Sequence, residues 1–251
     1  MPGILNGEKG KAIFTPNPEI LLKQASDAEF RDILGQADYL IPDGIGLYIA
    51  VQMLEYDSRF LRVALLPYFF FNLFFKRDML YKKYGERICW SDLTKLLLNY
   101  SMNNNIRVVI LDRYNPTDLP KVASQKVFEK NLSQKFPWLL FDFYVYNPDE
   151  KLSIQSQVQK SDAKILFSTF GMKAQEQCVL DVMAQCPNLK LWLWVGSSFD
   201  YFIGFQKRAP RVFSKLGLEW LYRLATSPNK SRQLSKVGNA IFVFLWKVIK
   251  N

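Results

Sequence analysis

The sequence contains no histidine among its 251 residues. Histidine is the side chain that most often acts as an acid or base near neutral pH, and it is the commonest metal ligand. Its absence excludes Ser-His-Asp and Cys-His catalytic groups. Acid–base chemistry must therefore be carried by Asp, Glu, Lys or Tyr, or by a phosphate of the substrate.

Cysteine is also scarce, with Cys89, Cys178 and Cys186 far apart and no CxxC pair. This spacing indicates neither a zinc site nor a disulfide framework, so we expect buried free thiols in a reducing cytoplasm. The N-terminal residues MPGILNGEKGKAIF lack the apolar core of a secretion signal. Secretion is therefore not indicated.

No apolar run is long enough to span a bilayer. The longer one, Leu61–Phe75, is interrupted by Arg62, Pro67 and Asn72, and the second is Ala240–Trp246. Both are flanked by cations, which favours helices that lie in the headgroup layer of a membrane. The alternatives are a buried helical hairpin for the first run, and a docked terminal helix or an oligomer interface for the second.

Acidic residues are nearly missing from the end of the chain. From Phe205 onward, ten Lys and Arg residues face a single acid, Glu219, and they account for +9 of the net charge of +10. Such a tail favours phosphate-bearing partners, which include nucleic acid, a nucleotide sugar or an anionic membrane.

What is present is hydrophobic and aromatic, at 49% and 15% of the residues, enough for a sizeable core. Short apolar runs that read as strands alternate with segments that read as helices, which predicts an α/β fold with a mostly parallel sheet. The expected strands are 12–15, 39–42, 106–111, 139–145, 163–168 and 189–195. The expected helices are 18–34, 92–102, 119–134, 151–160 and 173–184.

Four of these expected strands end in polar corners that contain Gly or Asn. The corners are Thr15-Pro16-Asn17, Asp43-Gly44, Thr169-Phe170-Gly171 and Gly196-Ser197-Ser198. Ligands of parallel sheets bind beyond the C-terminal ends of the strands, so these corners are candidate site residues. Each one alone is also typical of an ordinary turn.

The order of several blocks resembles the WecG/TagA/CpsF family of glycosyltransferases. The resemblance runs from about Ala12 to Arg232. It is carried by FTPNPEIL, ADYLIPDGIGL, GERICWSDL, FGMKAQE and VGSSFDYFIGFQKRAPRVFSKLGLEWLYRL. Of these, the block that begins at Gly196 is the most specific.

The resemblance implies an inverting, metal-independent enzyme that uses no cofactor. It would move a sugar from a UDP-sugar to an undecaprenyl-diphosphate-linked sugar, in bacterial surface polysaccharide synthesis at the cytoplasmic face of the plasma membrane. The fold would be a Rossmann-like α/β domain over residues 1–204, with an apolar insertion at about 56–84. Residues 205–251 would form a basic, helical appendage that contacts the anionic membrane as a peripheral element.

The resemblance also implies roles for individual residues. Asp43 would be the general base and Thr15 would act beside it in catalysis. The substrate-binding residues would be Asn17, Gly44, Arg87, Gln175, Glu176, Gly196, Ser198, Asp200, Arg208, Arg223 and Lys230. The cations among them would stabilise the departing UDP.

Two of these residues also have plain structural readings. Asp43 could cap the helix that begins near Ile45. Arg87 could form a surface ion pair with Glu86 or Asp92.

The sequence departs from the family pattern after the strand at 106–111. Where the family has a Gly-Gly-Lys/Arg turn, this chain has Asp112-Arg113-Tyr114-Asn115. Without the two glycines the backbone cannot approach a nucleotide closely. Asp112 also adds a negative charge where the nucleotide would lie. We therefore expect a different sugar donor or weakened donor binding.

Two rival functions follow from the same residues. One is a catalytically weak relative that binds lipid-linked sugar and assists a partner enzyme. The other is a nucleic-acid-binding protein, prompted only by the basic tail and disfavoured because no nucleic-acid-binding motif is present. The sequence leaves a homo-oligomer open.

Overall fold

The computed structural model describes residues 2–250 except 87, 114–120, 147–150, 170–173, 184, 197, 205–206, 211, 214–218, 227–229 and 239–241. The chain divides into two compact units, each described by itself. Unit 1 comprises Met1–Thr15, Glu29–Ile41 and Cys89–Lys207. Unit 2 comprises Pro16–Ala28, Pro42–Ile88 and Arg208–Asn251.

Unit 1 is built on a six-stranded sheet in the order β2-β1-β6-β5-β3-β4, and every described strand pair is parallel. The strands are β1 (Lys11–Phe14), β2 (Tyr39–Leu40), β3 (Val108–Arg113), β4 (Phe141–Tyr146), β5 (Ile165–Ser168) and β6 (Leu191–Trp194). Each parallel connection must cross over the sheet, usually through a helix. The α/β fold with a mostly parallel sheet is thus confirmed.

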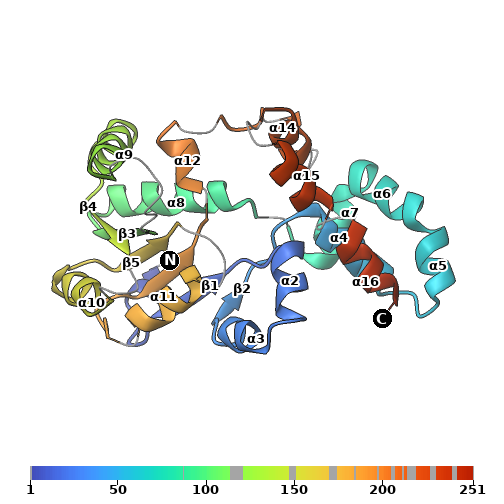
Figure 1. Cartoon of the computed structure of the whole chain (residues 1–251), viewed down its shortest axis with the longest axis horizontal. Helices are drawn as coiled ribbons and strands as arrows, with labels where there is room; N and C mark the ends of the chain where they lie inside the picture. The colour runs from blue at the N-terminus through green and yellow to red at the C-terminus, as the bar shows by residue number, and fades with distance from the viewer. Residues whose placement is uncertain are drawn as a thin grey trace. The chain divides into compact units, whose positions relative to one another are not determined.

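Helices cover both faces of this sheet, as parallel sheets require. In Figure 1, α8, α9 and α12 lie on one side of the sheet, and α10 and α11 on the other. The helices of unit 1 are α1 (Pro2–Leu5), α3 (Ala28–Gly35), α8 (Trp90–Asn103), α9 (Lys121–Lys135), α10 (Lys151–Lys160), α11 (Ala174–Met183) and α12 (Ser198–Phe202). The residues of β5 and β6 are all buried, because both faces are covered.

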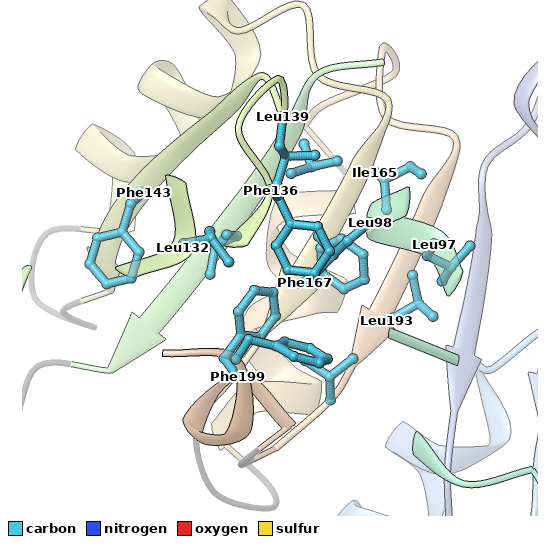
Figure 2. Close-up of a cluster of buried hydrophobic side chains, with 14 of the residues drawn as sticks. Leu97, Leu98, Leu132, Phe136, Leu139, Phe143, Ile165, Phe167, Leu193 and Phe199 are labelled. Atoms are coloured by element: carbon cyan, nitrogen blue, oxygen red, sulfur yellow. The ribbon is translucent and has the colours of Figure 1, made fainter. Parts of the chain in front are cut away.

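The core on the α8, α9 and α12 side is rich in phenylalanine. Figure 2 shows Phe136 and Leu132 of α9 close to Phe167 of β5 and Phe199 of α12. The rings of Phe167 and Phe199 meet edge to face, with centroids 5.7 Å apart. This edge-to-face arrangement suits the charge distribution of the two rings, so it stabilises the core beyond what their buried area contributes.

Unit 2 is helical in its described residues. Its helices are α2 (Pro18–Gln24), α4 (Ile45–Met53), α5 (Arg59–Ala64), α6 (Leu66–Phe75), α7 (Arg77–Tyr84), α14 (Glu219–Thr226), α15 (Lys230–Gly238) and α16 (Phe244–Lys250). Buried residues of α4, α6, α7 and α16 form one apolar cluster, which includes Ile49, Phe69, Leu80 and Leu245. The apolar segments 56–84 and 242–250 therefore share a core.

The polar residues of the longer apolar run face inward. Arg62 is 6% exposed, and its guanidinium donates to the carbonyls of Tyr56 and Val248, each at 2.7 Å. Asn72 is 3% exposed and its amide donates to the Gln52 side chain at 3.0 Å. Gln52 in turn donates to the Tyr48 carbonyl at 2.9 Å. These bonds fix α5 to α16 and α6 to α4, since buried polar groups need partners.

Two differences from the expected elements have local causes. The helix expected over 18–34 is two helices, because Ser26 donates its hydroxyl to the Lys23 carbonyl and offers the backbone a non-helical bond. The strand expected over 39–42 ends at Leu40, close to Pro42, which cannot donate to a ladder. The predicted boundary between residues 204 and 205 stays a prediction; residues 42–88 belong to the same compact unit as 208–251.

Gly10, just before β1, lies where the sheet packs too tightly for a side chain. A Cβ at Gly10 would lie 1.8 Å from the indole of Trp192, which is 3% exposed, and 2.8 Å from the Leu189 carbonyl oxygen. We expect Gly10→Ala to lower the free energy of unfolding by about 1–3 kcal/mol, because neither group can yield cheaply. Urea unfolding measures this.

The control is Gly35→Ala at the exposed end of α3, where a Cβ meets nothing within 4 Å. Equal stability of the two variants would show that the β1–β6 packing is looser than described.

Candidate active site

Thr15 directly follows β1 and is held by β6. The indole Nε1–H of Trp194 donates to Thr15 Oγ1 at 2.8 Å, and both side chains are buried, at 1% and 6% exposure. Trp194 also stacks on Phe14, with centroids 4.3 Å apart and planes 12° apart. Because the hydroxyl oxygen accepts from the indole, the hydroxyl proton of Thr15 is directed to another acceptor.

The corner after β6 holds three of the predicted residues. Gly196 has φ of +48°, a left-handed conformation that favours glycine. Ser198 starts α12, is 4% exposed and donates its main-chain N–H to the Val195 carbonyl at 3.1 Å. Asp200 lies in the first turn of α12 and is partly exposed. Since β6 adjoins β1, this corner and Thr15 follow neighbouring strands at the same edge of the sheet.

The ends of β3 and β5 are joined by a hydrogen bond between side chains. Thr169 Oγ1 donates to Asp112 Oδ1 at 3.0 Å, and the Thr169 main-chain N–H donates to the Leu111 carbonyl at 3.0 Å. Both side chains are partly exposed, whereas Leu111 and Ser168 beneath them are fully buried. Burial raises the pKa of the nearby Tyr146, at the end of β4, to about 12, so its phenol is neutral at neutral pH.

The predicted residues Gln175 and Glu176 both lie in the first turn of α11. Glu176 is fully buried. The Gln175 side chain lies outside the described atoms. Their assignment to substrate binding stays a prediction.

In unit 2, the residues around Asp43 form a defined corner. The Asp43 main-chain N–H donates to the Pro16 carbonyl at 3.0 Å, and the Asn17 side chain accepts from the Ile20 N–H at 2.9 Å. Asn17 is therefore the N-cap of α2, and its amide oxygen is engaged there. Asp43 itself is partly exposed.

The N-cap of α4 is Gly44. Asp43 therefore lies one residue before the position at which it was considered as a helix cap. Gly44 has φ of +104°, a conformation that side chains rarely adopt, and a Cβ there would lie 3.4 Å from Pro18 Cδ. Glycine is thus required by the backbone that presents Asp43.

The predicted phosphate-binding cations belong to several segments. Arg208 is partly exposed and precedes Pro210, while Arg223 lies on α14 and Lys230 begins α15. The side chains of Arg223 and Lys230, and all of Arg87, lie outside the described atoms. Their roles stay predictions, as does the ion pair considered for Arg87.

Large apolar side chains of unit 2 are exposed on α5, α6 and the start of α16. Phe60 is 79% exposed, Phe75 75% and Phe242 72%. The Lys250 ammonium lies 5.1 Å from the ring of Trp246. We call the exposed apolar residues of α5, of α6 and of the segment 242–246 the aromatic face; they are Phe60, Leu61, Val63, Tyr68, Phe71, Phe75, Phe242, Val243 and Trp246.

No helix in the described part of the chain has both the length and the apolar character needed to cross a membrane.

Sequence reasoning missed the role of Trp194, because a tryptophan in a strand-like run reads as ordinary core. It also missed the inward bonds of Arg62 and Asn72, which it took only as interruptions of an apolar run. No signal in the sequence distinguishes a polar residue that faces a core from one that faces solvent.

The bond between Trp194 and Thr15 yields a stability test. Trp194→Phe keeps a ring stacked on Phe14 but leaves Thr15 Oγ1 without its buried donor, so we expect a loss of about 1 kcal/mol in the free energy of unfolding. Thr15→Val leaves the indole N–H of Trp194 without its acceptor, and we expect a similar loss in the free energy of unfolding. Combining the two should cost less than their sum, by about 1 kcal/mol, in a double-mutant cycle of urea unfolding. Strict additivity would show that the bond contributes nothing.

Comparison with known proteins shows the family of the chain. The sequence profile of the glycosyl transferase WecG/TagA/CpsF family matches residues 3–70 and 73–251. A protein of Bacillus spizizenii named N-acetylglucosaminyldiphosphoundecaprenol N-acetyl-beta-D-mannosaminyltransferase is 25% identical over 243 residues, which is 96% of this chain and 81% of the relative. The protein of the same name from Bacillus subtilis strain 168 is 24% identical over 230 residues, or 91% of this chain and 76% of the relative. The chain therefore belongs to the WecG/TagA/CpsF family of glycosyltransferases.

Proposed function

We propose that the protein transfers a sugar from a UDP-sugar to an undecaprenyl-diphosphate-linked sugar, with Asp43 as general base and inversion at the anomeric carbon. The relatives' names specify an undecaprenol-linked N-acetylglucosaminyl diphosphate acceptor and an N-acetylmannosaminyl group. An acceptor of this kind fits a chain whose apolar side chains and cations lie together on unit 2. The product would serve bacterial surface polysaccharide synthesis.

The observation that carries the proposal is the corner at Asp43. A partly exposed carboxylate stands there on a backbone fixed by the Asp43 N–H bond to Pro16 and by the positive φ of Gly44. A general base must be held in place and must reach solvent-borne substrate. In a chain without histidine, a fixed carboxylate is the group suited to this task.

The reaction balances as a single displacement. An acceptor hydroxyl oxygen forms a bond to the anomeric carbon of the donor while its proton passes to the Asp43 carboxylate. The bond from the anomeric carbon to the phosphate oxygen breaks, and UDP leaves with the electron pair. Attack from the side opposite UDP inverts the anomeric centre.

The remaining roles follow from the same scheme. The Thr15 hydroxyl, whose oxygen accepts from Trp194, would donate to an oxygen of the substrate. Arg208, Arg223 and Lys230, with Arg87, would neutralise the charge that develops on UDP without a metal ion. Asn17, Gly44, Gln175, Glu176, Gly196, Ser198 and Asp200 would shape the sugar and nucleotide sites.

The alternative is a catalytically weak relative that binds lipid-linked sugar and assists another transferase. It is favoured by Asp112, which places a negative charge at the end of β3. Turnover that depends on Asp43 would exclude it.

The Asp43 assignment predicts a loss of rate. With a panel of UDP-sugars and a lipid-diphosphate-linked N-acetylglucosamine acceptor, we expect acceptor-dependent UDP release that is unchanged by EDTA. Asp43→Asn should lower kcat by at least about a hundredfold, because the amide cannot take the proton. Asp32→Asn, on the exposed surface of α3, is the matched control.

A full rate in Asp43→Asn would refute the general-base role while leaving the transferase intact. No UDP release from any donor, by a folded wild-type protein, would favour the accessory function.

We also propose that the aromatic face binds the cytoplasmic surface of the plasma membrane as a peripheral element. Its phenylalanines stand beside Lys76, Arg77, Lys247 and Lys250, the combination typical of interfacial helices. Arg62 and Asn72 keep their polar groups inside unit 2, so the outward surface of α5 and α6 is left apolar.

The aromatic face predicts binding to anionic vesicles. Replacing Phe60, Phe75 and Phe242 together by Ser should weaken binding to vesicles of phosphatidylglycerol and phosphatidylcholine at least tenfold, because three rings no longer enter the acyl boundary. The control is the pair Trp138→Ser and Leu152→Ser, equally exposed residues of unit 1 at 76% and 80%. Vesicle sedimentation measures both.

Equal binding by the triple variant and the wild type would place the membrane contact elsewhere. If the wild type ignores vesicles but self-associates in solution, and the triple variant does not, the face is an oligomer interface instead.

A further inference from the structure

The strands β3 and β5 lie side by side, but the chain leaves them in opposite directions. β3 leads to β4 at one edge of the sheet, whereas β5 leads to β6 on the other side, as the order β2-β1-β6-β5-β3-β4 requires. In open parallel sheets, ligands bind beyond the carboxyl ends of strands at the point where the connections diverge. The two residues that follow the last paired positions, Leu111 and Ser168, are Asp112 and Thr169.

Asp112 is held at this point by its neighbour. Thr169 Oγ1 lies 3.0 Å from Asp112 Oδ1 and 3.3 Å from the Leu111 carbonyl oxygen, while its N–H is bound to the same carbonyl. The threonine backbone is therefore fixed to β3, and its hydroxyl orients the carboxylate. The strand residues beneath, Leu111 and Ser168, are fully buried, whereas Asp112 is partly exposed.

The chemistry of a carboxylate limits what it can bind. An ionised carboxylate only accepts hydrogen bonds and repels phosphate. The part of a nucleotide sugar that can approach it is therefore a neutral group with donors. A vicinal diol fits best, because its two hydroxyls can donate to the two carboxylate oxygens in short, charge-assisted bonds.

We propose that Asp112, positioned by Thr169, accepts hydrogen bonds from the 2′,3′-diol of the donor's ribose and so selects a ribonucleotide. This inference rests on the proposed UDP-sugar donor. In this proposal Asp112 contributes to donor binding, whereas its negative charge beside a phosphate would weaken donor binding. Diphosphate binding is then left to other parts of the site.

The test compares UDP with 2′-deoxy-UDP by calorimetry on the full chain. We expect the wild type to bind UDP about tenfold more tightly than 2′-deoxy-UDP, the worth of one charge-assisted hydrogen bond. Asp112→Ala should remove that preference by weakening UDP more than 2′-deoxy-UDP, because 2′-deoxy-UDP has only the 3′-hydroxyl to lose as a donor to Asp112. Thr169→Val, which keeps the charge and the shape but removes the orienting hydroxyl, should reduce the preference partly.

Asp162→Ala is the matched control, because Asp162 is exposed and precedes β5 at the opposite edge of the sheet. Its preference for UDP should equal that of the wild type. Thermal unfolding verifies that each variant is folded. If Asp112→Ala does not fold, the comparison of Thr169→Val with the wild type tests the proposal.

Three outcomes overturn the inference in distinguishable ways. A wild type that binds UDP and 2′-deoxy-UDP equally refutes the ribose contact and leaves the proposed function standing. A wild type that is sensitive to N3-methylation of the uracil but not to the 2′-hydroxyl, with that sensitivity lost in Asp112→Ala, assigns the carboxylate to the base. A wild type that binds neither nucleotide removes the UDP-sugar donor, and with it the proposed function.

Discussion

The parallel pairing of β1 with β6 is the constraint on which the rest of unit 1 depends. It joins residues 11–13 to residues 191–193, which lie 180 positions apart in the sequence. Because all described pairs are parallel, every connection crosses the sheet and every strand ends at the same edge. Thr15 and the Gly196 corner are therefore neighbours through register alone. A slip of one residue in this pair would turn Trp194 away from Thr15.

A second constraint acts in unit 2, where buried polar side chains decide which surface is apolar. A buried arginine needs hydrogen-bond acceptors, and Arg62, at 6% exposure, donates to two main-chain carbonyls. The Asn72 amide N–H donates to the Gln52 side chain and so joins α6 to α4. With these polar residues inside, the phenylalanines on the opposite surfaces of α5 and α6 face outward. The exposed aromatic rings are thus a consequence of internal hydrogen bonding, and they do not reflect a weakly packed core.

The strands and the polar corners that follow them were predictable from the sequence, but the contacts at those corners were not. Apolar runs bounded by Gly, Pro and Asn located every strand of the sheet, because buried parallel strands are continuously hydrophobic. The same reasoning could not separate a cap from a catalytic acid at Asp43, since both need a carboxylate before a helix. The structure narrows this choice, because Gly44 occupies the cap position. The sequence reasoning also joined 18–34 into one helix, which the structure divides in two, because the Ser26-Asp27 pair is too weak a signal to set against a helical pattern.

Asp43 and Asp112 illustrate why residue type alone does not determine a role. Both are partly exposed acids, Asp112 within the last residues of β3 and Asp43 a few residues after β2. Asp43 stands on a backbone held by Pro16 and Gly44, which leaves its carboxylate beside a substrate hydroxyl in the proposed reaction. Asp112 receives the hydroxyl of Thr169, and a carboxylate that already accepts one bond is better suited to hold a ligand than to take its proton. In a chain that has no histidine, two carboxylates would have to share proton transfer and binding, and the two proposed roles rest on the main-chain frame around Asp43 and on the Thr169 bond to Asp112.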